Sequence, residues 1–320
     1  MFKNQVLFFA IFFCVCVCGV DAHAGNIAIC QSMQHPSLDD VRKGFIKRLN
    51  YRSQDLKFRV FQNFNEDDLL KKGADKAVSE INGSDYELVF CIGTPAAVAC
   101  KNRFKDKDII FSAVTDPVRA GLVESMQISG TNMAGMSDMS PVDRQLELIR
   151  QIQPESRTLG MVYSRDEQNS RKIAEIMTEK CPKLGFELVK IAVKDESEIK
   201  ARLDSALEKC DALYVPTDNK VVSVLNEVVE VCLKHKVPVY SADPNSVSRG
   251  AVVALSVDYF QMGRESAEMA LQVLNGTDPA QMAVRKLDNL QISLNLSTAE
   301  LLDLQIPVSL ILAADVVYKE

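Results

Sequence analysis

The sequence predicts an α/β protein made of two doubly wound parallel-sheet lobes. Short apolar strands alternate with amphipathic helices along most of the chain, and this alternation is typical of parallel sheets covered by helices on both faces. It begins again at Ser140, so two series of roughly 110 residues, each near the usual size of a domain, follow one another. The 320-residue chain is too long for one ordinary core and suits two lobes.

The first 24 residues have the features of a secretory signal peptide. Lys3 supplies a positive charge, residues 6–20 form an apolar run, and Ala22 and Ala24 have the spacing that a signal peptidase reads. The alternative is an uncleaved membrane anchor, but about 15 apolar residues are too few for a bilayer core that needs roughly 20. We therefore expect cleavage near Ala24 and an exported, periplasmic protein.

The first series contains four expected strands separated by three expected helices. The first helix is the clearest, because Ser37 can cap it, Asp40 follows three residues later, and Val41, Phe45 and Leu49 recur at helical spacing. The expected strands are residues 26–30, 58–61, 88–92 and 109–111, and the helices are residues 37–49, 69–81 and 96–100.

The second series starts at Ser140, where Ser140, Pro141 and Asp143 form a typical helix start. The strands expected after this helix are residues 158–163, 187–191, 212–215, 237–240 and 252–255, with helices at 170–181, 198–207 and 221–234. In the tail we expect a helix at 259–274 that stops at Gly276, a strand at 291–294, and a last helix capped by Ser297. This tail is too short for a third domain.

Composition and motifs exclude several classes of function. A net charge of −6 and the lack of a basic run argue against nucleic acid or an anionic membrane as partner. His35 and His235 are isolated, and the chain has no G-x-S-x-G, Walker or G-x-G-x-x-G motif. We therefore expect neither an enzyme nor a bound cofactor.

Six of the nine cysteines lie beyond the predicted signal segment. In an oxidising compartment they could pair, and Cys181 with Cys210 is the candidate pair. Their long, irregular spacings include no C-x-x-C, which argues against a zinc or other metal site. The spacings favour the alternative that most of them are buried as small apolar side chains.

Polar residues follow the expected strands, at the edge where ligands bind in open α/β sheets. The first series offers the hydroxyls of Thr94, Ser112 and Thr115, which with helix N–H groups suit a carboxylate. The second series offers Asp218 and Asp243, which suit an ammonium group. A zwitterion between the lobes would satisfy both sets, although each residue alone could simply cap a helix.

Five segments carry a resemblance to a known family. They are Thr-Pro-Ala-Ala at 94–97, Phe-Ser-Ala-Val-Thr-Asp-Pro at 111–117, Gly-Leu-Val at 121–123, Gly-Met-Ser-Asp at 135–138 and Tyr-Val-Pro-Thr-Asp-Asn at 214–219. Over residues 27–314 the chain resembles the periplasmic binding component of the ABC transporter family that includes tryptophan- and tyrosine-type binding proteins.

The resemblance implies a type I periplasmic-binding fold with three interlobe crossings, near residues 137–139, 256–258 and 288–291. Lobe 1 would then comprise residues 25–137 with 258–288, and lobe 2 residues 138–257 with 289–320. It also implies an aromatic or related amino acid as the ligand and a permease with an ATPase as the partner. We expect a monomer that closes at this hinge on its ligand.

The resemblance also implies which residues contact the ligand. Members hold the α-carboxylate at the positions of Thr94, Ser112, Val114 and Thr115, and acids face the amine at Asp218 and Asp243. Asn169 matches a recurring Asn-Ser in the second lobe, and Gln34 stands where relatives often have an acid before His-Pro. The predicted ligand contacts are therefore Gln34, Thr94, Ser112, Val114, Thr115, Asn169, Thr217, Asp218 and Asp243.

Two alternatives remain open at this point, and two others are disfavoured. The same fold can bind a sugar or nucleoside, in which case stacked aromatic residues are expected in both lobes. It can also serve a sensory receptor rather than a permease. An enzyme on a two-lobed scaffold lacks a base and nucleophile here, and a repressor would need DNA-binding helices where the signal peptide stands.

Overall fold

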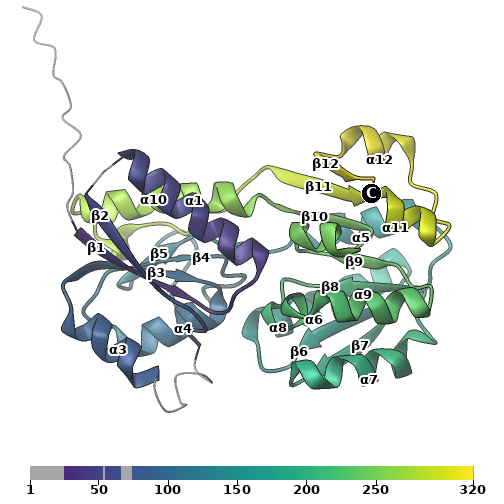
Figure 1. The fold of residues 1–320 in the computed structure, drawn as a ribbon, viewed down its shortest axis with the longest axis horizontal. Coiled ribbons are helices and arrows are strands. Elements are labelled where there is room, and N and C mark those ends of the chain that lie inside the picture. The colour runs from purple at the N-terminus through teal and green to yellow at the C-terminus, as the bar shows by residue number, and fades with distance from the viewer. Residues whose placement is uncertain (1–24, 53–54, 66–73, 320) are drawn as a thin grey trace, which may run out of the picture.

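The computed structural model describes residues 25–52, 55–65 and 74–319, which form two α/β lobes lying side by side (Figure 1). The predicted signal segment and the first part of the predicted helix 69–81 lie outside the described residues. Lobe 1 is the five-stranded sheet with its helices, and lobe 2 is the seven-stranded sheet with its helices. The predicted fold class, two mostly parallel sheets flanked by helices, is confirmed.

Lobe 1 has a fully parallel sheet with the strand order β2-β1-β3-β4-β5. Its strands are β1 (Gly25–Gln31), β2 (Leu56–Phe61), β3 (Tyr86–Ile92), β4 (Ile109–Ser112) and β5 (Met133–Gly135). The central strands are apolar on both faces and almost wholly buried, as expected for a parallel sheet between two helical layers. The three-residue β5 is missing from the sequence prediction because its apolar run is too short to stand out.

The helices of lobe 1 cover both faces of its sheet. They are α1 (Pro36–Arg52), α3 (Ala74–Gly83), α4 (Thr94–Arg103) and α10 (Tyr259–Leu274), with the short η3 (Pro279–Gln281). One apolar core lies under α1 and α10, and a second lies under α3 and α4. Helix α10 therefore packs on lobe 1 although it follows most of lobe 2 in the sequence (Figure 1).

Two glycines allow α1 and α10 to touch along their backbones. A Cβ atom at Gly44 would lie 2.1 Å from the carbonyl oxygen of Phe260, and one at Gly263 would lie 2.0 Å from that of Val41. No side chain fits at these distances, so only glycine permits the crossing. The contact fixes the first turns of both helices, which face the gap between the lobes.

Lobe 2 has a sheet with the order β12-β11-β10-β9-β8-β6-β7, in which only the β10–β11 pair is antiparallel. Its strands are β6 (Thr158–Ser164), β7 (Glu187–Val193), β8 (Ala212–Val215), β9 (Val239–Ser241), β10 (Val253–Val257), β11 (Leu290–Asn295) and β12 (Val316–Tyr318). The return strand β11 thus extends the lobe 2 sheet.

The helices of lobe 2 again form two layers. They are α5 (Val142–Ile152), α6 (Gln168–Lys180), η1 (Pro182–Leu184), α7 (Glu196–Leu207), α8 (Asn219–Ser223), α9 (Leu225–Lys234), η2 (Pro244–Arg249), α11 (Leu296–Leu301) and α12 (Val308–Ala313). Helices α5, α6 and α12 contribute to one apolar core, and α7, α8, α9 and η2 to the other.

The predicted caps and the predicted tail need correction. Pro141, with no capping side chain, precedes α5, so Ser140 does not cap it. In the tail, Asn295 caps α11 by accepting a hydrogen bond from the Thr298 backbone N–H at 2.8 Å, and Ser297 lies inside the helix. Helix α12 and strand β12 follow, so α11 is not the last element.

The chain passes between the lobes three times within the described residues. It leaves lobe 1 after β5, returns between β10 and α10 near Asp258, and leaves again before β11. Met136 forms an isolated parallel bridge with Arg285, which holds the first and third passages side by side. This arrangement can act as a hinge because all three connections are short.

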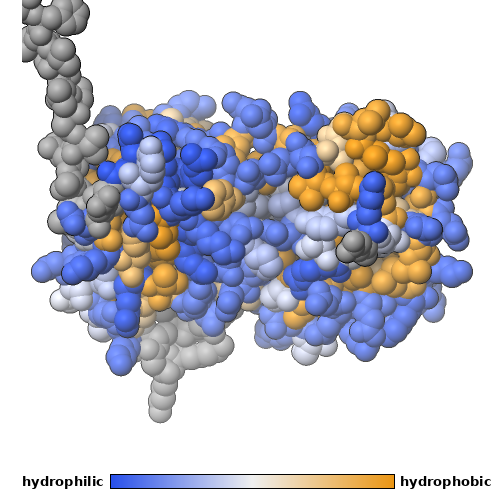
Figure 2. Space-filling model, turned by 45° about the horizontal axis from the view of Figure 1, so that its top comes forward, coloured by the Kyte–Doolittle hydropathy of each residue, from blue (hydrophilic) through white to orange (hydrophobic). Residues whose placement is uncertain are grey.

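The C-terminal elements of lobe 2 carry several exposed apolar side chains. Leu301, Val308 and Leu312 are each at least two-thirds exposed, and they belong to the hydrophobic area over α11 and α12 in Figure 2. No helix of the described residues has the length and apolarity needed to cross a membrane.

Candidate ligand-binding site

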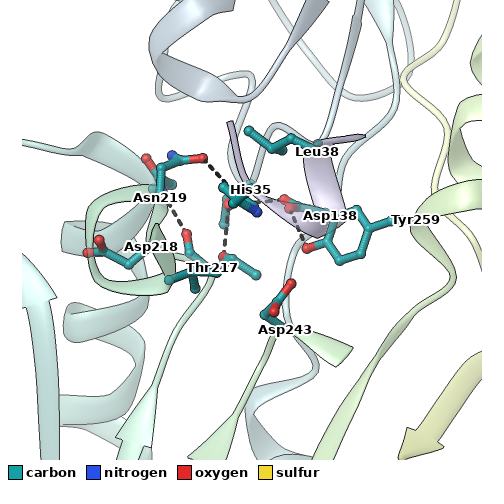
Figure 3. A pocket seen from close by; sticks show the side chains of 12 residues that line it. His35, Leu38, Asp138, Thr217, Asp218, Asn219, Asp243 and Tyr259 are labelled. Carbon is teal, nitrogen blue, oxygen red and sulfur yellow. Dashed lines mark hydrogen bonds between the residues drawn. The ribbon is translucent and has the colours of Figure 1, made fainter. Parts of the chain in front are cut away.

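A cleft between the lobes contains an inner cavity and a wider outer opening, with Asn219 lining both. The inner cavity is built from the starts of α1 and α10, the connections after β4, β8 and β9, and the passage after β5 (Figure 3). Its lining residues are His35, Leu38, Ala113, Thr115, Asp138, Asn169, Thr217, Asp218, Asn219, Val222, Asp243 and Tyr259. The outer opening is much the larger of the two, and the inner cavity has room for little more than a water-sized group.

Six of the nine predicted contact residues lie in this cleft. Thr94 lines the outer opening, and the other five, which line the inner cavity, are Thr115, Asn169, Thr217, Asp218 and Asp243. They meet because the carboxyl ends of parallel strands lie at one edge of each sheet, and these edges face each other.

The other three predicted residues lie elsewhere. The Ser112 hydroxyl is buried and accepts a hydrogen bond from the Ser266 hydroxyl of α10 at 3.0 Å. Val114 is fully buried in the apolar core under α4. Gln34 is exposed and lines neither part of the cleft. In this structure, core packing accounts for Ser112 and Val114.

The Asp218 carboxylate is saturated by hydrogen bonds from lobe 2 itself. It accepts from the Ser164 backbone N–H at 2.6 Å, the Ser164 hydroxyl at 2.8 Å, the Ser170 hydroxyl at 2.6 Å and the Val221 backbone N–H at 2.9 Å. A carboxylate has about four acceptor positions. Asp218 therefore caps α8 and ties it to β6 and α6, with little capacity left for a ligand.

Asp243 has a different environment, because its carboxylate reaches the opposite lobe. It accepts a hydrogen bond from the Ser37 hydroxyl of α1 and one from the Ser246 hydroxyl at 2.8 Å. Ser37 therefore links the lobes rather than capping α1, which already begins at Pro36. The remaining acceptor positions of Asp243 are open to the cavity (Figure 3).

Asp138 and Tyr259 are cavity residues that sequence reasoning did not assign. Asp138 accepts hydrogen bonds from the Thr115 hydroxyl at 3.0 Å and the Tyr259 hydroxyl at 3.1 Å. Burial raises the pKa of the Asp138 carboxyl. The sequence contained one signal, the Gly-Met-Ser-Asp segment at 135–138, but only the passage between lobes brings it to the cavity.

Glu167 is another residue that sequence reasoning missed. It is buried just before α6 and accepts hydrogen bonds from the Asn219 amide at 2.7 Å, the Asn169 amide at 3.0 Å and the backbone N–H groups of Asn219 and Lys220. Burial, and secondarily the nearby Asp218 charge, raise the pKa of Glu167 to about 7.

Several buried polar atoms at the cleft lack a hydrogen-bond partner among the described residues. Among them are the hydroxyl oxygens of Ser32 and Thr94, Nδ1 of His35 and Oδ1 of Asn169. Buried polar atoms are normally paired, because leaving one unpaired costs about 1–3 kcal/mol. Such atoms gathered around one cleft are available for hydrogen bonds to water or to a polar ligand.

Comparisons of the sequence and the structure with known proteins identify the family of the chain. Residues 26–318 match the family model described as ABC transporter substrate binding protein. The chain belongs to this family. Its members bind solutes rather than catalyse reactions, which confirms the expectation that the chain is not an enzyme. The fold prediction of a type I periplasmic-binding arrangement is confirmed as well.

Among the relatives of this substrate-binding protein is the tyrosine-binding protein of Clostridioides difficile strain R20291. The two are 37% identical over 284 residues, which cover 88% of this chain and 81% of the relative. Two solved structures also match at full coverage of their own chains. A Streptococcus pneumonia ABC domain in complex with L-Trp has a TM-score of 0.85 at 29% identity over 92% of this chain. A ligand-free, open substrate-binding protein from Clostridium difficile has a TM-score of 0.71 at 32% identity over 93% of this chain.

The lobes of this substrate-binding protein touch each other across the cleft. The Thr115 and Thr217 hydroxyls lie 3.4 Å apart, and Lys172 forms an ion pair with Asp116 at 3.1 Å. Arg119 of lobe 1 forms a bidentate ion pair with Glu175 of α6. The TM-score is higher with the L-Trp complex than with the open relative, although the latter is slightly more similar in sequence.

The cysteines do not form a site. All six described cysteines are buried free thiols, so the candidate pair Cys181–Cys210 is not formed. Within the described ranges, no group of three or more His, Cys, Asp or Glu side chains is placed to hold a metal ion.

Proposed function

We propose that this protein captures an amino acid, aromatic or closely related, between its lobes and delivers it to an ABC importer. The observation that carries this proposal is the division of the cleft. One wall offers unpaired hydroxyl donors beside a helix N-terminus, and the other parts offer carboxylate, amide and imidazole acceptors. A molecule with a carboxylate and an ammonium group satisfies both.

The carboxylate is proposed to lie against α4. The Thr94 hydroxyl stands at the first residue of this ten-residue helix, and the Ser32 hydroxyl lies beside it, both buried and unpaired among the described residues. The positive end of the helix dipole and free backbone N–H groups favour an anion at this place. Ala113, which lines the cavity with a φ of 55°, holds the backbone after β4 in a conformation uncommon outside glycine.

The ammonium group is proposed to lie near Asp243 and Asp138. Both carboxylates are buried at the inner cavity, and the Asp243 charge interacts with His35 and Arg249. A buried carboxylate is costly unless it is paired. A ligand cation would offset this cost in a way that a neutral sugar cannot.

The ligand side chain is proposed to extend into the outer opening. Met33, Pro95 and Val98 give this opening an apolar side on lobe 1, and methionine adapts to aromatic rings of different shape. The preference for an aromatic amino acid rests on two relatives, one named tyrosine-binding and one in complex with L-Trp.

Binding is proposed to close the lobes about the three passages. The direct contacts between lobes and the better superposition on the L-Trp complex support a closed arrangement here. We further propose that the chain is exported after cleavage near Ala24, acts as a monomer, and has a permease with an ATPase as its partner.

A thermal-shift screen with the twenty amino acids, common sugars and nucleosides tests this function. A ligand at a hundredfold excess over its Kd stabilises the folded state by about 2.7 kcal/mol, which raises the melting temperature by several degrees. We expect such a shift with tyrosine, tryptophan or a related amino acid. A shift with a sugar or nucleoside and none with any amino acid would contradict the proposal.

A further inference from the structure

Glu167 fixes which way two cavity asparagines point. Its carboxylate accepts the side-chain amide N–H of Asn219 at 2.7 Å and that of Asn169 at 3.0 Å. An ionised carboxylate only accepts, so both amides must turn their nitrogen towards Glu167. Their oxygen atoms must therefore point away from it.

The Asn219 oxygen continues this chain of hydrogen bonds across the cleft to lobe 1. It lies 3.4 Å from Nε2 of His35 (Figure 3). Because an amide oxygen only accepts, a hydrogen bond here requires the proton on Nε2. Burial lowers the pKa of His35, although the Asp243 charge opposes this effect, so the ring favours its neutral form. In that form Nδ1 is a lone-pair acceptor.

Two acceptor atoms in the cavity therefore lack a hydrogen-bond donor among the described residues. Nδ1 of His35 and Oδ1 of Asn169 are both buried, line the same cavity, and have no partner among the described residues. Asp243 lies in the same cavity with acceptor positions open. An ammonium group has three N–H donors. These three acceptors, with Asp138 in the same cavity, can supply a partner for each N–H.

We propose that Glu167 is a positioning residue that sets His35 Nδ1 and Asn169 Oδ1 as acceptors for the ligand ammonium, acting on His35 through Asn219. This inference rests on the proposed function, since it assumes a ligand with an ammonium group. Among the described residues, the Glu167 carboxylate accepts hydrogen bonds from the two amides and from two backbone N–H groups, and these occupy its acceptor positions. It therefore acts by orienting other side chains.

This chain of hydrogen bonds from Glu167 through Asn219 to His35, here called the relay, makes ligand binding depend on pH. A protonated Glu167 becomes a donor, which favours turning an amide oxygen towards it and leaves an amide nitrogen facing the ammonium. Because its pKa is about 7, ligand binding should release a proton near neutral pH, and affinity should rise as pH rises through 7. Other charged groups surround these two residues. Asp218 lies beside Glu167, and the outer opening next to it is lined by Lys194, Asp195 and Lys220. The charges that act on His35 are those of Asp39, Asp243 and Arg249.

Calorimetric titration with L-tyrosine between pH 6 and pH 8 tests the relay. For the wild-type protein we expect an affinity about tenfold higher at pH 8 than at pH 6, the factor for one linked proton. Glu167→Gln should bind about tenfold or more weakly at pH 8 and lose this pH dependence. Glu179→Gln is the matched control, since Glu179 is an exposed residue of α6 paired with Lys183; it should behave as the wild type. Equal pH profiles for the wild type and Glu167→Gln would overturn the proposal.

Nitrogen NMR of the histidines tests the relay without any ligand, and so separates it from the proposed function. The chain has three histidines, so His35→Asn suffices to assign the His35 signals. We expect a neutral ring with its proton on Nε2 at pH 8. A proton on Nδ1 would overturn the relay. If the protein binds no amino acid at any pH, the proposed function fails, and with it the role of the acceptors in binding.

Discussion

The two walls of the cleft are built in opposite ways. On lobe 1, the hydroxyls of Ser32 and Thr94 are buried and unpaired among the described residues. On lobe 2, the carboxylates of Asp218 and Glu167 are saturated by hydrogen bonds within their own lobe. Lobe 1 therefore holds donors ready for a ligand, whereas much of the lobe 2 polarity serves to position its few free acceptors.

Asp243 is the lobe 2 carboxylate for which we predict the largest effect on binding. Asp243→Ala removes the carboxylate that faces the cavity, and loss of one partner from a buried charge pair costs about 2–5 kcal/mol of binding free energy. Calorimetry with L-tyrosine should show this loss. An affinity within threefold of the wild type would show that Asp243 does not contact the amine.

Asp218 belongs to the same wall as Asp243 but should affect stability instead. Asp218→Asn places an amide nitrogen against donors of Ser164 and Ser170, and should lower the free energy of unfolding by about 2–4 kcal/mol. Thermal unfolding of the ligand-free protein measures this. An unchanged melting temperature combined with abolished binding would instead make Asp218 a direct ligand contact.

Thr94 tests the lobe 1 wall. Thr94→Val keeps the shape of the side chain and removes a hydroxyl that has no partner among the described residues, so the ligand-free protein should be as stable as the wild type or slightly more stable. Binding should weaken by about 1–2 kcal/mol, the cost of one hydrogen bond to a charged group. Parallel measurements of melting temperature and Kd check that stability is kept or gained while binding weakens. A variant that loses stability would contradict the idea of a hydroxyl held ready for the ligand.

The interlobe ion pair of Arg119 and Glu175 should have the smallest effect. Both side chains are about half exposed, and surface ion pairs contribute little and are screened by salt. Arg119→Ala should speed ligand release slightly at low salt, with no difference at high salt. Stopped-flow dissociation at two salt concentrations measures this, and a large effect that persists in high salt would point to a role beyond closure.

Much of the fold could be predicted because the spacing of apolar residues and the positions of strand ends can be read from short stretches of sequence. Thr115, Asp218 and Asp243 were placed at the cleft by one rule, that parallel strands end at a common edge. The roles of Asp218 and Asp243 could not be told apart, because both simply follow a strand in sequence. Their hydrogen-bond partners, which are distant in sequence, distinguish them. Asp218 bonds to Ser164 and Ser170 of its own lobe, whereas Asp243 bonds to Ser37 of the opposite lobe.

The missed residues share a physical cause. His35 meets Asn219 across the cleft, and Asp138 meets Thr115 at a passage between the lobes. Glu167 meets Asn219 within lobe 2, from a distant part of the sequence. Ser112 shows the opposite case, since a hydroxyl at a strand end can equally face a covering helix, here Ser266 of α10.

The decisive measurement is a calorimetric comparison of L-tyrosine with tyramine, which lacks the carboxylate, and with 3-(4-hydroxyphenyl)propionate, which lacks the amine. The division of the cleft predicts that L-tyrosine binds and that each analogue binds at least about tenfold more weakly, because each leaves one set of buried polar groups unpaired. Equal affinity for L-tyrosine and either analogue would contradict it.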